Sequence, residues 1–126
     1  MNVSFFRRGF TLIEMSVVVA IIGILYVTVV PMYGKTIIRT KETALKKDLH
    51  VFRKTIDSYF KDRGQWPESL ETLVTEGYLR KIPEDPFTES DDTWQIIPSQ
   101  PGLSDVYDVK SGSEKTGLDG KKYSEF

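Results

Sequence analysis

The chain has no cysteine and a single histidine, His50. Without cysteine it can form neither a disulfide framework nor a cysteine metal site, and one histidine leaves little for a histidine-based triad or metal cluster. Gly112, Gly117 and Gly120 do not make a phosphate loop, because the segment after them is too short for the helix that such a loop needs. No basic patch for nucleic acid appears in the acidic C-terminal half. These absences predict a protein that is not an enzyme and does not bind nucleic acid.

The sequence does have one long apolar segment near its N-terminus. From Phe10 to Val30 the only charged residue is Glu14. As a helix, roughly 20 such residues extend about 30 Å, which is enough to span a bilayer. A carboxylate without a partner in that segment costs perhaps ~3 kcal/mol. Glu14 is therefore expected to meet a positive charge, or else to lie near the interface, where it reaches water or is protonated.

The residues around Glu14 form a recognisable pattern. Arg7-Arg8-Gly9 precede Phe10-Thr11-Leu12-Ile13-Glu14, and Gly23 and Pro31 follow. This pattern resembles the class III signal of type IV pilins and type II secretion pseudopilins, although it covers only the first quarter of the chain. The resemblance implies that a membrane prepilin peptidase cleaves between Gly9 and Phe10 and methylates the new amine. It also implies that Glu14 promotes incorporation into a filament, where it meets the amine of a neighbouring subunit.

Other targeting signals fit the segment less well. A secretory signal needs an Ala-x-Ala type of cleavage site after the apolar stretch, and Tyr26 to Lys35 offers none. Arg7-Arg8 resembles a twin-arginine signal only faintly. Counting positive charges favours a head on the cytoplasmic side, because Lys35, Arg39 and Lys41 follow the segment. The head is placed outside the cytoplasm by the resemblance, not by that rule.

The periodicity divides the rest of the chain into segments. We expect a leader at 1–9, a transmembrane and polymerisation helix at 10–33, an amphipathic stalk helix at 34–62 and a small head at 63–126. In the stalk, apolar residues recur at three- and four-residue steps from Ile38 to Phe60. Gly64 is a plausible C-cap. Gly23 and Pro31 mark places where the long helix can bend, either as a simple kink or as a compliant joint of a filament.

The head is predicted to combine a short helix with a small sheet. Pro67 to Glu76 reads as a helix closed by Gly77. Thr93 to Ile97 and Val106 to Lys110 read as strands, and Lys121 to Phe126 as a third, short strand. The fold class is therefore α+β and pilin-like, with a three-stranded antiparallel sheet packed on the upper half of the stalk.

The net charge of -1 conceals an asymmetry between the two halves. Residues 1–60 carry nine basic and four acidic residues, a balance of +5, whereas residues 61–126 carry eight basic and fourteen acidic residues, a balance of -6. Stalks and heads of neighbouring subunits are thus expected to attract one another, in a way that salt would weaken. Ordinary solvated surface charge is the alternative.

The resemblance also implies a function. A chain of this kind is a structural subunit of a type II secretion pseudopilus in the bacterial inner membrane, with a single membrane pass and a periplasmic head. Its expected partners are further copies of itself, minor pseudopilins, the prepilin peptidase and the inner-membrane secretion platform. The lack of cysteine favours pseudopilins over pilins, whose heads are often closed by a disulfide. Asp85-Pro86 is followed by Phe87-Thr88 instead of the usual Trp-Gly, which leaves the subfamily open.

Two alternatives remain at this point. One is a type IV pilin of a surface fibre for adhesion, motility or DNA uptake, and the other is a membrane-tethered binding or enzymatic domain that works as a monomer.

A calcium ion is the one ligand that the resemblance implies. Major pseudopilins bind Ca2+ in the last loop of the head, which corresponds here to residues 111–119. Ser113, Glu114 and Asp119 offer the oxygen atoms that calcium prefers. The family loop normally carries more acidic residues, so a plain solvated turn is the alternative.

Overall fold

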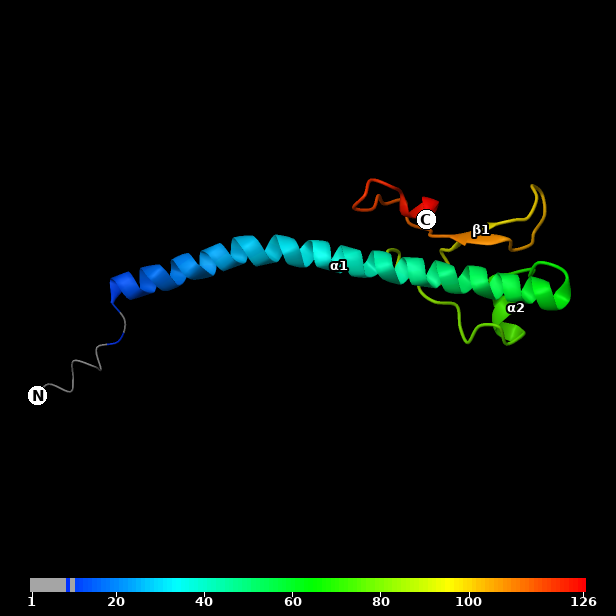
Figure 1. The fold of residues 1–126 in the computed structure, drawn as a ribbon, viewed down its shortest axis with the longest axis horizontal. Coiled ribbons are helices and arrows are strands. Elements are labelled where there is room, and N and C mark those ends of the chain that lie inside the picture. Colours follow the sequence, from blue (N-terminus) through cyan, green and yellow to red (C-terminus); the bar gives the residue numbers. More distant parts are fainter. Residues whose placement is uncertain (1–8, 10) are drawn as a thin grey trace, which may run out of the picture. The chain divides into compact units, whose positions relative to one another are not determined.

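The computed structural model describes residues 9 and 11–126. The chain divides into two compact units, Met1–Ile37 and Ile38–Phe126. One helix, α1 (Leu12–Arg63), contributes residues to both units (Figure 1). The predicted basic leader and Phe10 lie outside the described residues, except for Gly9.

In the first unit, α1 is apolar on all of its faces. Large apolar side chains are exposed throughout, from Leu12, which is 88% exposed, to Tyr33, which is 66% exposed. Among the described helices, α1 alone is long and apolar enough to cross a bilayer, and its apolar window buries no residue. A helix that is hydrophobic all round requires an apolar environment on every side. The predicted N-terminal apolar helix is therefore confirmed.

In the second unit, the same helix buries a single face. The buried residues of α1 recur at spacings of three and four, as the sequence predicts for an amphipathic helix. The opposite face carries the exposed polar residues, His50 among them. The core of the unit comprises Leu45, Leu49, Phe52, Ile56, Tyr59, Leu70, Leu73, Trp94, Val106, Val109 and Tyr123.

The end of α1 follows the predicted glycine. The helix stops at Arg63, and Gly64 has a φ of 72°, a left-handed conformation that favours glycine. Its N–H donates to the carbonyl oxygen of Phe60 at 2.8 Å. Trp66 then stacks on the Phe60 ring with 4.1 Å between centroids. The chain is thereby turned back along the helix.

A short helix, α2 (Leu70–Thr75), follows the turn. Ser69 caps it, because its hydroxyl oxygen accepts from the N–H of Thr72 at 3.2 Å. The helix is shorter than the predicted 67–76, since the cap lies two residues after Pro67. Leu70 and Leu73 bury its apolar side, as expected.

The sheet of the head has two strands. β1 (Gln95–Ile97) and β2 (Asp108–Lys110) are antiparallel, with Ile96 opposite Val109. The third strand predicted at the C-terminus is not confirmed. That segment instead forms the 3-10 helix η2 (Tyr123–Glu125), and only a single bridge joins Thr116 to Lys122. The 3-10 turn brings the Tyr123 ring into the core, where it stacks on Phe87 at 3.8 Å between centroids.

Candidate assembly site

The predicted assembly residue Glu14 lies in the first turn of α1. Thr11 stands just before the helix, and its hydroxyl oxygen accepts from the N–H of Glu14 at 3.2 Å. Its carbonyl oxygen accepts from the N–H of Met15 at 3.0 Å. A threonine followed three residues later by glutamate is the sequence of a capping box, and an acidic side chain is favoured at a helix N-terminus. Sequence reasoning missed Thr11, although the Thr-x-x-Glu spacing was visible.

The carboxylate of Glu14 differs from the other polar groups of the apolar segment. Ser16 and Thr28 donate their hydroxyl protons to carbonyl oxygens one turn earlier on α1, each at 2.8 Å. These hydroxyls are satisfied within the helix and need neither water nor a neighbour. Within residues 9 and 11–126, by contrast, no side chain or amide is bonded to the Glu14 carboxylate. It is thus a charged group available to a partner from outside the described chain.

Gly23 and Pro31 lie farther along the same helix. A Cβ placed on Gly23 would meet no atom within 4 Å, so a neighbouring helix can approach its backbone there. Pro31 lies inside α1, which continues as a helix on both sides of it. Because proline has no N–H, the carbonyl of Val27 loses its usual helical donor. The compliance expected at Pro31 stays a prediction.

The loop predicted to bind calcium is held largely by hydrogen bonds within the protein. The Ser113 hydroxyl oxygen accepts from the N–H of Lys115 at 3.2 Å, and a carboxylate oxygen of Asp119 accepts from the N–H of Lys121 at 3.1 Å. Glu114 is exposed. Across the part of the chain that the structure describes, no three His, Cys, Asp or Glu side chains are grouped so as to hold a metal ion. Calcium binding at this loop stays a prediction.

A carboxylate of α1 holds this C-terminal loop in place. One oxygen of Glu42 accepts from the N–H of Leu118 and from the phenol of Tyr123, each at 2.9 Å. Burial, and then the hydrogen bond to Glu42, raises the pKa of Tyr123 to about 12. We call Glu42, Leu118 and Tyr123 the C-terminal clasp. Sequence reasoning missed it, because its partners lie 76 and 81 positions apart.

A buried carboxylate, that of Asp85, joins the middle of the head to the residues that follow β2. Asp85 is fully buried and accepts from the Ser111 hydroxyl at 2.6 Å, the Gly112 N–H at 3.1 Å and the Phe87 N–H at 2.9 Å. These three donors satisfy a charge that would otherwise be costly to bury. The negative charge of Asp85 also contributes to a raised pKa of Asp48, whose main cause is burial. The Asp85-Pro86 pair was noticed in the sequence, but the three bonds that Asp85 accepts, here called the Asp85 hub, were not predicted.

Comparison with known proteins places these features in a family. The family described as "Prokaryotic N-terminal methylation motif" matches residues 5–28. No solved structure matches the chain.

Similar proteins span nearly the whole chain. "Type II secretion system core protein G" of Pseudomonas aeruginosa is 32% identical over 129 residues, covering 90% of this chain and 89% of its own length. The protein of the same name from Vibrio cholerae is 33% identical, again covering 90% and 89%. That of Escherichia coli is 31% identical, covering 94% of this chain and 87% of its own length. The similarity thus includes the head as well as the N-terminal motif, and the chain belongs to the type II secretion system core protein G family of pseudopilins.

Proposed function

We propose that the chain is a filament subunit of a type II secretion system, held in the bacterial inner membrane by α1 with its head in the periplasm. Family similarity over 90% of the chain supports the secretion system, and the methylation motif over residues 5–28 supports pilin-like processing. The observation that carries the proposal is the Glu14 carboxylate. It has no bonded partner within residues 9 and 11–126 and lies in the part of α1 that is apolar on every face.

Processing would supply the missing partner. Residues 1–9 are then a leader, and cleavage between Gly9 and Phe10 creates a positive amine that methylation leaves charged. That amine lies four residues before Glu14 along the chain. In an array of parallel subunits, the amine of one copy can pair with Glu14 of the next. Such a pair offsets much of the cost of a carboxylate in an apolar medium and fixes the axial position of each subunit.

The rest of the first unit suits close helix packing. Its exposed apolar side chains can contact lipid before assembly and neighbouring helices afterwards. Gly23 permits close approach of a second helix, as small residues do in membranes. We assign residues 10–33 to polymerisation in the membrane, with Pro31 as a point of compliance, residues 34–62 to the stalk and residues 63–126 to the head.

The role is structural, and the work of export comes from other components. The prepilin peptidase, minor pseudopilins and the inner-membrane platform are the expected partners. We assign this chain no catalytic step.

Substitution of Glu14 tests the proposal. Glu14→Ala removes both the charge and the polar side chain, whereas Glu14→Gln retains a polar side chain that suits the third helical position and removes the charge alone. Both variants should be cleaved after Gly9 yet fail to form filaments, and secretion should fall at least about tenfold, since one lost ion pair per subunit in an apolar medium exceeds about 1.4 kcal/mol. The assays are filament recovery and export of a secreted protein.

A Glu14→Asp variant is the matched control, because it keeps the charge on a shorter side chain. Partial assembly of Glu14→Asp with none in Glu14→Gln supports pairing with an amine. Normal secretion by Glu14→Gln would contradict the proposed role of Glu14. Fibres on the cell surface, without a secretion defect in a deletion strain, would favour a type IV pilin.

A further inference from the structure

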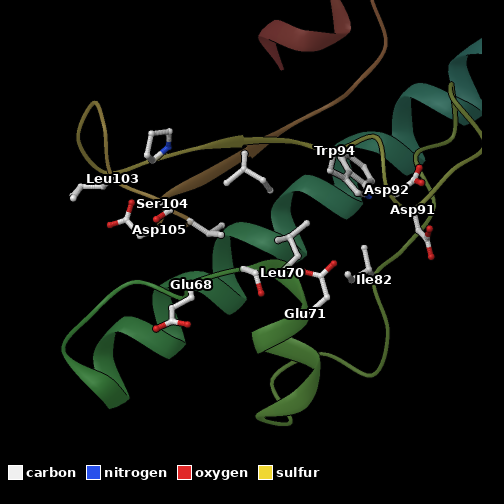
Figure 2. A pocket seen from close by; sticks show the side chains of 14 residues that line it. Glu68, Leu70, Glu71, Ile82, Asp91, Asp92, Trp94, Leu103, Ser104 and Asp105 are labelled. Carbon is white, nitrogen blue, oxygen red and sulfur yellow. The ribbon is translucent and has the colours of Figure 1, made fainter.

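A groove with apolar and acidic lining, here called the acidic groove, opens between α2 and the β1–β2 connection of the head (Figure 2). It has a volume of about 450 Å³. Leu70, Ile82, Trp94 and Ile96 contribute apolar lining. Leu103, which is 52% exposed, extends this apolar surface along the connection. The second unit therefore leaves part of its apolar surface uncovered.

All of the charged residues at the rim of the groove are acidic. Five carboxylates line it, and no Lys, Arg or His does: Glu68, Glu71, Asp91, Asp92 and Asp105. Figure 2 shows Glu71 between the two acidic ends of the groove. The ion pairs found among the described residues, Arg53 with Asp108 and Arg63 with Glu76, involve none of the five. An occupant must therefore present cationic groups beside an apolar side chain.

A surface of that chemistry exists on the exposed side of α1 in the same unit. One face of the helix carries four exposed residues at successive steps of four, three and seven positions: Lys47, Val51, Lys54 and Lys61. Val51 is 38% exposed and stands between two of the lysines. We call these four residues the basic stripe. None of them lines the groove.

We propose that the acidic groove of one subunit receives the basic stripe of a second copy of this chain. Lysine ammonium groups of the stripe meet the rim carboxylates, and Val51 covers part of the apolar lining. The two surfaces are different parts of one subunit, so the contact is heterologous and each copy can bind a further copy. Contacts of this kind produce open helical filaments when the rotation does not close. The inference rests on the proposed function, to which it adds a contact between the head of one subunit and the stalk of another.

Cysteine cross-linking in the full chain tests the contact directly, because the natural sequence has no cysteine. Glu71→Cys and Lys54→Cys are made separately and together, and membranes of cells that assemble filaments are treated with a short bis-maleimide. Co-expression of the two single variants should give a dimer, and the double variant should give a ladder of oligomers. Glu71→Cys paired with Lys122→Cys is the control, since Lys122 is exposed but belongs to neither surface. A ladder no stronger than this control, in cells that form filaments, would overturn the contact.

Charge reversal provides the second measurement. Glu71→Lys and Lys54→Glu should each lower the filament yield about tenfold, because like charges then face each other, and the double reversal should restore it. No rescue by the double reversal would contradict the pairing. The unmodified chain is the reference in both experiments. Filaments that form without the cross-link would refute the contact and leave the proposed function intact. If the unmodified chain formed no filaments, both the proposed function and this contact would be refuted.

Discussion

The two units of the chain differ in how far their apolar side chains are exposed. In Met1–Ile37, large apolar residues such as Ile22, which is 59% exposed, are uncovered on every side of α1. In Ile38–Phe126, the same helix buries residues such as Ile56 completely. One helix thus has two environments: the second unit supplies its own core, whereas the first must obtain one from lipid or from other subunits.

The polar groups show the same contrast. Hydroxyls of the first unit bond to their own helix one turn away. In the second unit, Thr43 and Thr55 bond in the same way, but other polar groups reach farther. Arg53 pairs with Asp108 at 2.9 Å and donates to the carbonyl oxygen of Phe126 at 3.0 Å, so its bonds join α1 to β2 and to the C-terminus. Stability of the head should therefore be insensitive to changes in the membrane segment, and assembly should be sensitive to them.

The largest expected effect comes from removing the same side chain in the two units. Ile56→Ala leaves a cavity in the core and should lower the free energy of unfolding of the head by about 3 kcal/mol. Ile22→Ala, its matched control, should lower it by less than about 0.5 kcal/mol. Unfolding of the full chain in detergent can be followed by tryptophan fluorescence, because both tryptophans lie in the head. Equal losses in the two variants would break the distinction between the units.

A smaller effect is expected at the C-terminal clasp. Glu42→Gln replaces a carboxylate that accepts two hydrogen bonds with an amide, and should lower the free energy of unfolding by about 1.5 kcal/mol. Glu114→Gln, at an exposed residue of the same loop, is the control and should change it little. The same denaturation assay measures both. If the two variants behaved alike, the clasp would not contribute to the stability of the head.

These contacts show where sequence reasoning stops. The long helix, its end at Gly64, the helix after Pro67 and the two strands follow from local patterns of apolar residues and turn formers. The clasp, the Asp85 hub and the acidic groove depend on residues that lie far apart along the chain, and no periodicity records which of them meet. The third strand was expected because Lys121 to Phe126 follows a turn at Asp119-Gly120. The buried Tyr123 ring and its bond to Glu42 are instead accommodated by a 3-10 turn.

Alkaline titration tests the role of Tyr123 in the C-terminal clasp. Tyr123 donates to Glu42 only as a neutral phenol, and its pKa is raised from 10.0 in the unfolded chain to about 12 in the fold. The stability that depends on this group is fully present below pH 10 and is lost as the pH rises towards about 12. Tyr123→Phe should lack this part of the pH dependence, while the lysines titrate in both proteins. Identical pH profiles of stability over that range would contradict the assignment.

The smallest effect is expected from metal removal. The Ser113 hydroxyl and the Asp119 carboxylate already accept backbone protons, and Glu42 holds the loop from α1. Chelation should therefore shift the melting temperature of the head less than Glu42→Gln does. A larger shift, reversed by added calcium and absent in Asp119→Asn, would instead support the calcium site that the resemblance implies.

If the first unit obtains its partners by assembly after processing, the chain in the membrane must begin at residue 10. The mass of the N-terminal peptide, from protein purified out of membranes, tests this. We expect a peptide that begins at a methylated Phe10. An intact Met1, or a cut beyond Tyr33 that removes the apolar segment, would contradict it.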